Sequence, residues 1–307
     1  MRTLLAALLL LMAPQLSAQW PAVRRDTLLE HQLADLAGRV DGVVGIYVRH
    51  LPSGRGALIR PDELFPTASM IKVPILLATF QRIHDGDLTF DQPLRWADSL
   101  RYGGEDDLFD QLRDSATVPL NKVSMAMITS SDNAAALWLQ ALVGGGVYIN
   151  EWLAAHGFEA TRMNSRTPGR REIWQQYGWG QTSPREMAEM VVGIREGRFV
   201  STAASEAMYR HLTRIYWNGE ALSALPPTVQ VASKQGAVDR SRSEVVLVNA
   251  PHGDYVFAVI TREASDTSYV HDNQSWVMIR AVSALLWRAF EPGSPYQPPE
   301  GADRFVP

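Results

Sequence analysis

The sequence contains no cysteine, which excludes disulfide bonds, thiolate zinc sites, iron–sulfur clusters and cysteine nucleophiles. It also lacks a basic excess, because 29 lysines and arginines stand against 33 acidic residues and leave a net charge of −4. A phosphate backbone would find no surplus of positive charge, so we expect no nucleic-acid partner. Beyond the N-terminus, no apolar run reaches the roughly 18 residues that a membrane-spanning helix needs.

The first residues follow the pattern of a secretory signal peptide. Arg2 supplies a positive charge, residues 4–12 are apolar without interruption, and Ser17 and Ala18 are small enough for a cleavage site. We therefore expect residues 1–18 to be removed and the mature protein to be periplasmic or secreted. Without a cysteine the chain cannot carry a lipoprotein-type lipid anchor, so we expect no membrane anchor after processing.

The period of the apolar residues changes twice along the mature chain. Residues 27–40 have helical spacing, and residues 42–50 and 56–60 are typical of two strands joined by a turn. A long helical stretch follows, and strands return near the end. Helices are predicted at residues 70–84, 120–128, 133–142, 147–156, 184–195 and 202–213, strands at 228–234, 243–249 and 254–262, and a last helix at 271–290.

This order predicts an α/β (α+β) protein with one antiparallel sheet and flanking helices built from both chain ends. An all-helical domain would be inserted between the two halves. The expected boundaries are residues 26–65 with 215–292 for the sheet domain, 66–214 for the helical domain, and 293–307 for a loose, proline-rich tail. A cleft between two such domains is where we expect a site.

A serine and a lysine stand three residues apart at the boundary between these parts. Ser69 falls at the start of a predicted helix, and Lys72 shares its face. A serine becomes a good nucleophile when a neighbouring base takes its proton, and a desolvated lysine can be that base. The alternative interpretation is that Ser69 is an ordinary N-cap and Lys72 a solvated charge.

Lysine is scarce in this chain, which has three lysines and twenty-six arginines. Arginine cannot lose its proton near neutral pH, whereas a desolvated lysine can. A position that needs a proton acceptor would therefore exclude arginine, and Lys72 fits this requirement. Lys234, at the end of a predicted strand, is a second exception, and we interpret Lys122 as a solvated residue at a helix start.

A further polar motif, Ser130-Ser131-Asp132-Asn133, joins two predicted helices, where a short loop can point side chains into a cleft. Helix capping is the alternative explanation for its Asp and Asn. Three motifs follow one another in the chain: Ser69-x-x-Lys72, Ser131-Asp132-Asn133 and Lys234-x-Gly236. In these motifs and their order the chain resembles the penicillin-recognising serine enzymes, and most closely the class A β-lactamases. The resemblance extends over residues 27–290.

The resemblance implies catalytic roles for three residues. Ser69 would attack the carbonyl of a β-lactam or a related amide or ester, Lys72 would act as its base, and Ser131 would pass a proton to the departing nitrogen. The other motif residues would bind the substrate. Asn133 would bind the acyl-amide side chain, and Lys234 with Arg242 (or Arg240) would bind the carboxylate. Gly236 and Ala237 would lie beside the oxyanion, which the N–H groups of Ser69 and Ala237 would hold. The alternative for Arg242 and Arg240 is that each is an ordinary exposed arginine of a hairpin.

The chain departs from the family pattern at two positions. Gln235 stands where the family has threonine or serine, so a longer amide reaches into the carboxylate pocket. Thr167 stands where class A enzymes have the glutamate that activates the deacylating water, and a hydroxyl is not a base near neutral pH. A neutral Lys72 or the nearby Glu172 would have to serve instead, and we expect slow turnover.

The sequence thus predicts an exported, monomeric serine hydrolase that acts on a small molecule without a cofactor. The histidines form no pair at metal-ligand spacing, so no metal site is expected. The acidic residues 105–107 are interpreted as a solvated turn rather than a calcium loop. The alternative functions are a non-hydrolytic penicillin-binding or sensor protein on the same scaffold, or a peptidase- or esterase-like hydrolase.

Overall fold

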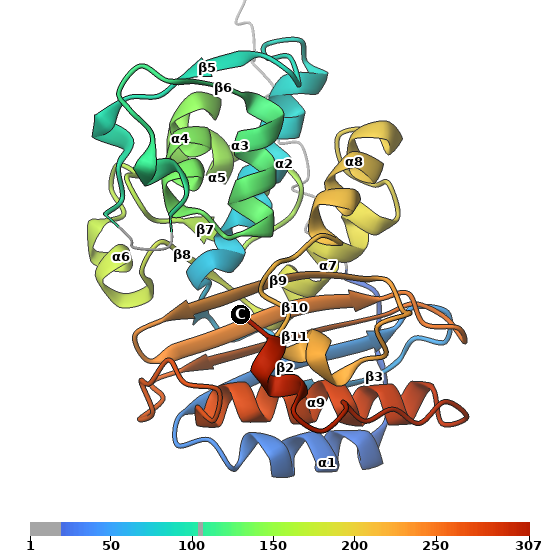
Figure 1. The fold of residues 1–307 in the computed structure, drawn as a ribbon. Coiled ribbons are helices and arrows are strands. Elements are labelled where there is room, and N and C mark those ends of the chain that lie inside the picture. Colours follow the sequence, from blue (N-terminus) through green and yellow to red (C-terminus); the bar gives the residue numbers. More distant parts are fainter. Residues whose placement is uncertain (1–19, 104–106) are drawn as a thin grey trace, which may run out of the picture.

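The computed structural model describes residues 20–103 and 107–307, so the expected signal peptide lies outside the described residues. Its centre is a six-stranded sheet in the order β1-β3-β2-β11-β10-β9 (Figure 1). All neighbours are antiparallel except β1, which pairs parallel with β3. Both chain ends supply strands: β1 (Arg24–Arg25), β2 (Val43–His50) and β3 (Arg55–Ile59) from one, and β9 (Val231–Val238), β10 (Ser241–Val248) and β11 (Tyr255–Arg262) from the other.

Both faces of this sheet are covered, which explains why its central strands are apolar over most of their length. In β10, Val246 and Val248 join a core with α1 (Thr27–Ala37) and α9 (Gln274–Phe290). Their neighbours Val245 and Leu247 alternate to the opposite face and belong to the core of the helical part. Figure 1 shows α1 and α9 side by side along one face of the sheet.

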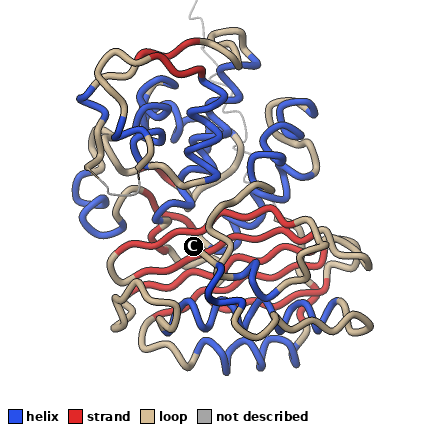
Figure 2. Tube along the Cα trace, viewed as in Figure 1, coloured by secondary structure: helices blue, strands red, loops and turns tan. Residues whose placement is uncertain are grey.

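The helical part lies on the other face, as the colouring by secondary structure makes clear (Figure 2). At its centre α2 (Lys72–His84) is buried from its first residue through Phe80, so this helix is surrounded by protein. α7 (Pro184–Arg195) packs directly on β10 and β11 of the sheet. The remaining helices are α3 (Leu120–Thr129), α4 (Asn133–Val143), α5 (Gly145–Ala155), α6 (Arg171–Tyr177) and α8 (Thr202–Leu212).

The predicted mixed fold, with a sheet flanked by helices and built from both chain ends, is confirmed. Elements of two to four residues were not predicted, because such short segments show no apolar period. The short strands are β4 (Phe65–Pro66), β5 (Pro93–Arg95), β6 (Thr117–Pro119), β7 (Arg162–Met163) and β8 (Gly180–Thr182), and the single turns of 3-10 helix are η1 (Ala68–Ile71), η2 (Asp98–Leu100), η3 (Phe109–Gln111), η4 (Ala221–Ala224) and η5 (Ala302–Phe305).

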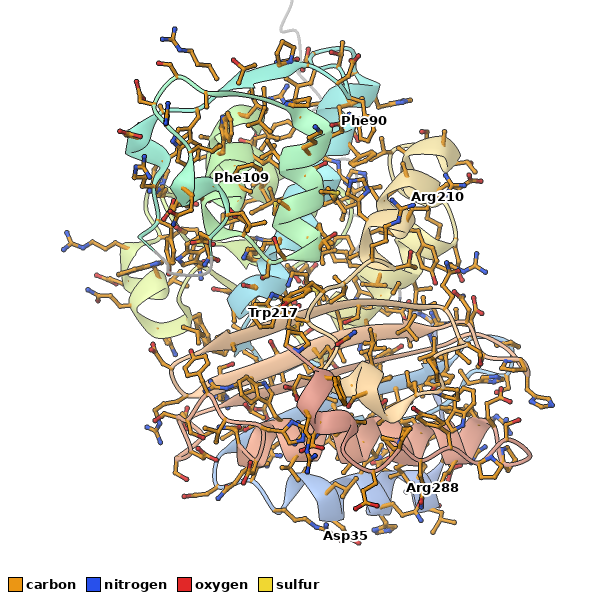
Figure 3. The ribbon with its side chains drawn as sticks, in the orientation of Figure 1. Asp35, Phe90, Phe109, Arg210, Trp217 and Arg288 are labelled. Carbon is orange, nitrogen blue, oxygen red and sulfur yellow. The ribbon has the colours of Figure 1, made fainter. Side chains whose placement is uncertain are left out.

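The segment after residue 292 returns to the middle of the molecule, where Figure 1 marks the C-terminus beside the sheet. There Val306 lies against Gly219, so close that a Cβ added to this glycine would stand 3.2 Å from the valine side chain. Trp217, labelled in Figure 3, lies at the junction of the sheet and the helical part. Within residues 20–103 and 107–307, no helix is both long and apolar enough to cross a membrane.

Candidate active site

Ser69 lies in η1, the single 3-10 turn that leads into α2. Its side chain caps no helix, so the N-cap interpretation does not hold, and its Oγ instead accepts a hydrogen bond from Lys72 Nζ at 3.0 Å. The preceding Ala68 has a φ of 43°, in the left-handed region that L-residues rarely adopt. Such backbone strain costs on the order of 1–3 kcal/mol and is concentrated at functional sites. The turn therefore holds Ser69 in one defined position.

Lys72 is the first residue of α2 and is completely buried. Its Nζ donates to Asn133 Oδ1 at 2.7 Å and to Ser131 Oγ at 3.1 Å, and it also contacts the Ser131 carbonyl. With Ser69 Oγ these make four oxygen neighbours, one more than the three hydrogens of an ammonium group. The interpretation of Lys72 as a solvated charge is therefore wrong.

Burial lowers the pKa of Lys72 to about 7, although the nearby carboxylates of Asp107 and Asp132 raise it. Near neutral pH a substantial fraction of Lys72 is then the free amine, whose lone pair can accept a proton from Ser69. A base poised near the working pH is the best compromise between being deprotonated and being basic. The electrostatics thus suit Lys72 to general-base chemistry.

The Ser131-Asp132-Asn133 loop faces Ser69 from the start of α4, and its three residues do different things. Asp132 caps α4 by accepting from Ala135 N at 2.7 Å, so the capping interpretation holds for this residue. Ser131 and Asn133 instead turn toward Lys72. Ser131 has a φ of 62°, a second strained residue beside the nucleophile.

Lys234 of β9 reaches the same serine from the sheet side, since its Nζ donates to Ser131 Oγ at 3.0 Å. The other two bonds of this completely buried ammonium go to Gln235, to the carbonyl at 2.9 Å and to Oε1 at 2.7 Å. Burial and the charge of Lys72 hold the pKa of Lys234 well below its ordinary value. All three hydrogens of the Lys234 ammonium group are therefore used, and the one that Gln235 Oε1 accepts is not free to be donated to a substrate carboxylate.

Gly236 explains how β9 approaches the nucleophile so closely. A Cβ at this position would stand 2.8 Å from the Thr67 carbonyl oxygen and 2.9 Å from Ala68 Cβ, closer than side-chain carbons tolerate. The glycine thus lets the strand pass directly beside η1. Ala237, the next residue, lines the same hollow as Ser69.

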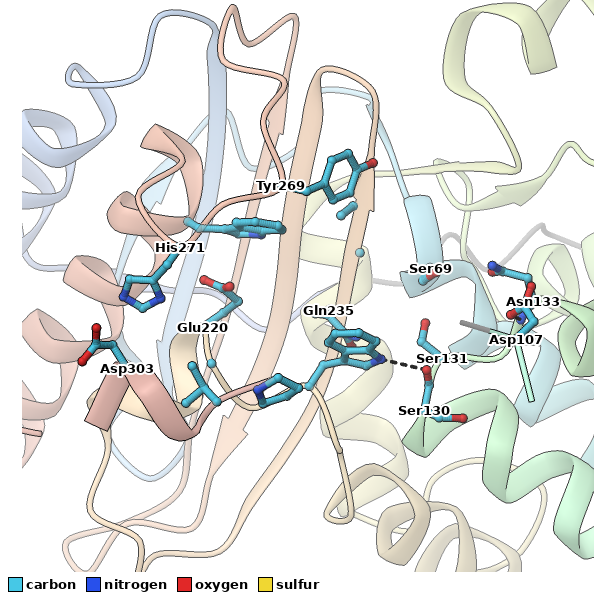
Figure 4. A pocket seen from close by; sticks show the side chains of 17 residues that line it. Ser69, Asp107, Ser130, Ser131, Asn133, Glu220, Gln235, Tyr269, His271 and Asp303 are labelled. Atoms are coloured by element: carbon cyan, nitrogen blue, oxygen red, sulfur yellow. Dashed lines mark hydrogen bonds between the residues drawn. The ribbon is translucent and has the colours of Figure 1, made fainter. Parts of the chain in front are cut away.

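Ser69 opens into a cavity of about 540 Å³ between the sheet and the helical part (Figure 4). Ser131 and Asn133 lie with it on one side, and Gln235 lies on the sheet side. Among the described residues, no lysine or arginine lines this cavity. Its far wall is aromatic and acidic and includes the tail: Trp217, Gly219, Glu220, Tyr269, His271, Trp276, Asp303, Val306 and Pro307.

Arg242, the expected second anchor for a carboxylate, does not line this cavity and is only 1% exposed. Its guanidinium donates to the backbone carbonyls of residues 239, 241, 267 and 268. The rings of Tyr269 and Trp276 lie 4.3 and 5.0 Å from it and separate it from the cavity. Arg242 thus holds the loop before α9 in place. Arg240 donates to the carbonyls of residues 263 and 264, but it also lines a second cavity together with Ser69 and Asn133.

The loop around Thr167, which corresponds to the loop with the glutamate in class A enzymes, does not direct the Thr167 side chain toward Ser69. Thr167 Oγ1 donates to the Ser165 carbonyl at 3.0 Å and sits against Gly146, where a Cβ would be 1.8 Å from it. Thr167 therefore does not line the cavity of Ser69. Glu172 is exposed in the first turn of α6 and does not line it either. Neither residue is placed to act on an acyl group at Ser69.

Asp107 is the residue that the sequence analysis missed, because residues 105–107 were interpreted as a solvated turn. It is only 4% exposed and lines the cavity together with Ser69. Its Oδ1 accepts from the backbone N–H of Asn133 at 2.6 Å, and its Oδ2 is buried and has no hydrogen-bond partner among the residues that the structure describes. Burial raises the pKa of this carboxyl group, while Asn133 and the charge of Lys72 lower it.

Within the described residues, no group of three or more His, Asp or Glu side chains is placed to hold a metal ion. The side chains that this site brings together are a serine hydroxyl, a buried amine, a second hydroxyl and a carboxyl group.

A nucleophilic serine and its lysine on one helix start, with a second serine and lysine opposite, are the arrangement of the penicillin-recognising serine enzymes. The family model described as the beta-lactamase enzyme family matches residues 28–290, and the chain belongs to that family. The resemblance inferred from the three motifs is thereby confirmed.

Solved structures agree with this placement. PBP-A is 27% identical with a TM-score of 0.78, and the match covers 89% of this chain and 99% of that one. A class A β-lactamase from Mycobacterium abscessus is similar in fold, at 22% identity and a TM-score of 0.76 over 87% of this chain and 100% of that one. An ancestral class A β-lactamase also has the fold, at 24% identity and a TM-score of 0.73 over 85% and 100% of the two chains.

Proposed function

We propose that the mature chain is an exported serine hydrolase whose Ser69 is acylated by β-lactams or by a related amide or ester. The observation that carries the proposal is the position of Lys72, completely buried and in contact with both Ser69 and Ser131. An arginine could not accept the Ser69 proton there near neutral pH, whereas a buried lysine can.

In the acylation step the amine of Lys72 takes the Ser69 proton while Oγ attacks the substrate carbonyl. The developing oxyanion lies between the N–H groups of Ser69 and Ala237. Ser131 Oγ accepts from both Lys72 and Lys234, so its own hydrogen is left for the departing nitrogen. Lys72 then passes the proton that it took from Ser69 to Ser131 and is again a free amine. Asn133 lines the same cavity and holds the acyl side of the substrate.

Deacylation is the slow step in this proposal, because Thr167 packs on Gly146 and Glu172 is exposed. A leucine-to-glutamate mutant of PBP-A is described as an acyl-enzyme complex with penicillin G. That relative supports acylation of this chain as well. The positions of Thr167 and Glu172 also favour the second candidate function, a penicillin-binding protein that is acylated and does not hydrolyse its acyl group.

Intact-mass spectrometry of the mature protein with penicillin G tests the proposal. A Ser69 adduct that slowly gives way to hydrolysed product is the expected result, and Ser69→Ala should form neither. An adduct that persists without product would support the non-hydrolytic candidate. If the unmodified protein yields neither adduct nor product, both candidates are wrong.

A further inference from the structure

We propose that Asp107 is the base that activates water for hydrolysis of the acyl-enzyme, taking over the task of the missing loop glutamate from a different part of the chain. This inference deepens the proposed function and rests on it. It explains how a site without a carboxylate at position 167 can still turn over.

The first argument is placement. Asp107 precedes η3 and lies beside Asn133, to whose backbone N–H its Oδ1 is bonded at 2.6 Å. Asn133 in turn accepts from Lys72, which contacts Ser69 at 3.0 Å. The carboxyl group and the nucleophile line one cavity, and Figure 4 shows Asp107, Asn133 and Ser69 on the same side of it.

The second argument is the free oxygen. Asp107 Oδ2 is shielded from solvent and has no hydrogen-bond partner among the described residues. Leaving a buried carboxylate oxygen unpaired costs free energy, and native structures seldom leave such a group without a function or a water. An oxygen of this kind can accept the proton of a water molecule drawn into the cavity.

The third argument is electrostatic. The acidic groups facing Asp107 are Asp132 at the start of α4 and the weakly acidic Tyr102, and Lys72 of α2 is the facing cation. Burial and the charge of Asp132 raise the pKa of Asp107, against the lowering by the Asn133 N–H and by the charge of Lys72, so the carboxylate is a stronger base than that of an ordinary exposed aspartate.

The step balances without a further reactant. Asp107 Oδ2 takes one proton from water while the water oxygen bonds to the acyl carbonyl carbon. The proton held by Asp107 passes through solvent in the cavity to Lys72. The tetrahedral intermediate then breaks its bond to Ser69 Oγ, Lys72 gives this proton to that oxygen and becomes the free amine again, and the product leaves as a carboxylic acid.

Asp107→Asn is the decisive variant, because the asparagine Oδ1 can still accept the Asn133 N–H. After acylation with penicillin G, release of the Ser69 adduct is followed by intact mass. We expect acylation close to that of the unmodified protein and release slower by about 10²-fold or more, since general-base loss costs 10²–10⁴. The matched control, Asp91→Asn, makes the same change at an exposed position and should release the adduct at the original rate.

A pH profile separates a base from a merely structural carboxylate. The release rate of the unmodified protein should fall as pH drops through the pKa of Asp107, and that dependence should vanish in Asp107→Asn. Equal release rates in both proteins, or loss of acylation together with release, would overturn this inference while leaving the proposed function standing. Glu172→Gln blocking release would overturn it too, whereas an unmodified protein that is never acylated would refute both.

Discussion

Lys72 Nζ lies 3.0 Å from Ser69 Oγ, with the lysine completely buried and the serine facing the cavity between the sheet and the helical part. The two residues are one helical turn apart, so the sequence alone ensures that they share a face. The sequence does not show how deeply Lys72 is buried, and this burial lowers the pKa of the lysine to about 7.

The first prediction is that Lys72→Arg abolishes acylation although it keeps the positive charge. An arginine cannot accept the Ser69 proton near neutral pH, so acylation should fall by about 10²–10⁴. Labelling with a fluorescent penicillin measures this directly, and the exposed Lys122→Arg serves as the matched control. Lys234→Arg should cost less, because charge rather than proton transfer matters there. Near-normal labelling of Lys72→Arg would show that Lys72 is not the base.

The second prediction concerns the pH dependence of acylation. The pKa of Lys72 is lowered to about 7, so the free amine predominates above that pH and disappears below it. The acylation rate should therefore rise with pH up to about 7 and then level off. Asp107 raises the pKa of Lys72, so Asp107→Asn should move this rise to lower pH. A flat profile from pH 5 to 9 in stopped-flow acylation would contradict a titrating lysine.

The sequence was enough to predict that Ser69, Lys72 and the loop at residues 131–133 lie together, because these residues stand in short motifs tied to local structure. It also predicted most long helices and the sheet, since their apolar residues recur with a clear period. What it could not supply were contacts between distant segments. The burial of Asp107, the aromatic cover over Arg242 and the packing of Thr167 on Gly146 depend on how separate loops meet.

Gln235 provides the third prediction. Its Oε1 takes a hydrogen of Lys234 at 2.7 Å, and the ammonium has no other hydrogen to spare. Gln235→Thr should free this donor for a carboxylate, and substrates that carry one should bind more tightly by about tenfold, as expected for one charge-assisted hydrogen bond. A methyl ester of the same substrate should not benefit. Equal gains for acid and ester in KM measurements would contradict this explanation.

The fourth prediction concerns Thr167→Glu, the substitution that restores the class A residue. In this chain the side chain at position 167 points at Gly146 rather than into the cavity of Ser69. A larger residue there should overpack the contact and destabilise the fold by about 1–3 kcal/mol. Release of the Ser69 adduct should stay within about twofold of the original rate. Tenfold faster release in the intact-mass assay would mean that the loop can turn its side chain toward Ser69.

The last prediction concerns the segment at residues 301–307. It lies beyond the family match, which ends at residue 290, yet Asp303, Val306 and Pro307 line the cavity of Ser69. These residues are mostly exposed and contribute little core, so removing the segment should change stability by only about 0.5 kcal/mol. The cavity would then be wider on the side opposite Asn133.

Deleting residues 301–307 should therefore speed acylation by β-lactams with bulky leaving-side substituents and leave compact ones nearly unchanged. Replacing the segment by glycine and serine of equal length is the matched control, because it keeps the chain but removes the side chains that form the wall. Both variants should shift the ratio of kcat/KM for bulky and compact substrates in the same direction. An unchanged ratio in both, measured on proteins with the original Tm, would show that this segment lies beside the cavity without restricting it.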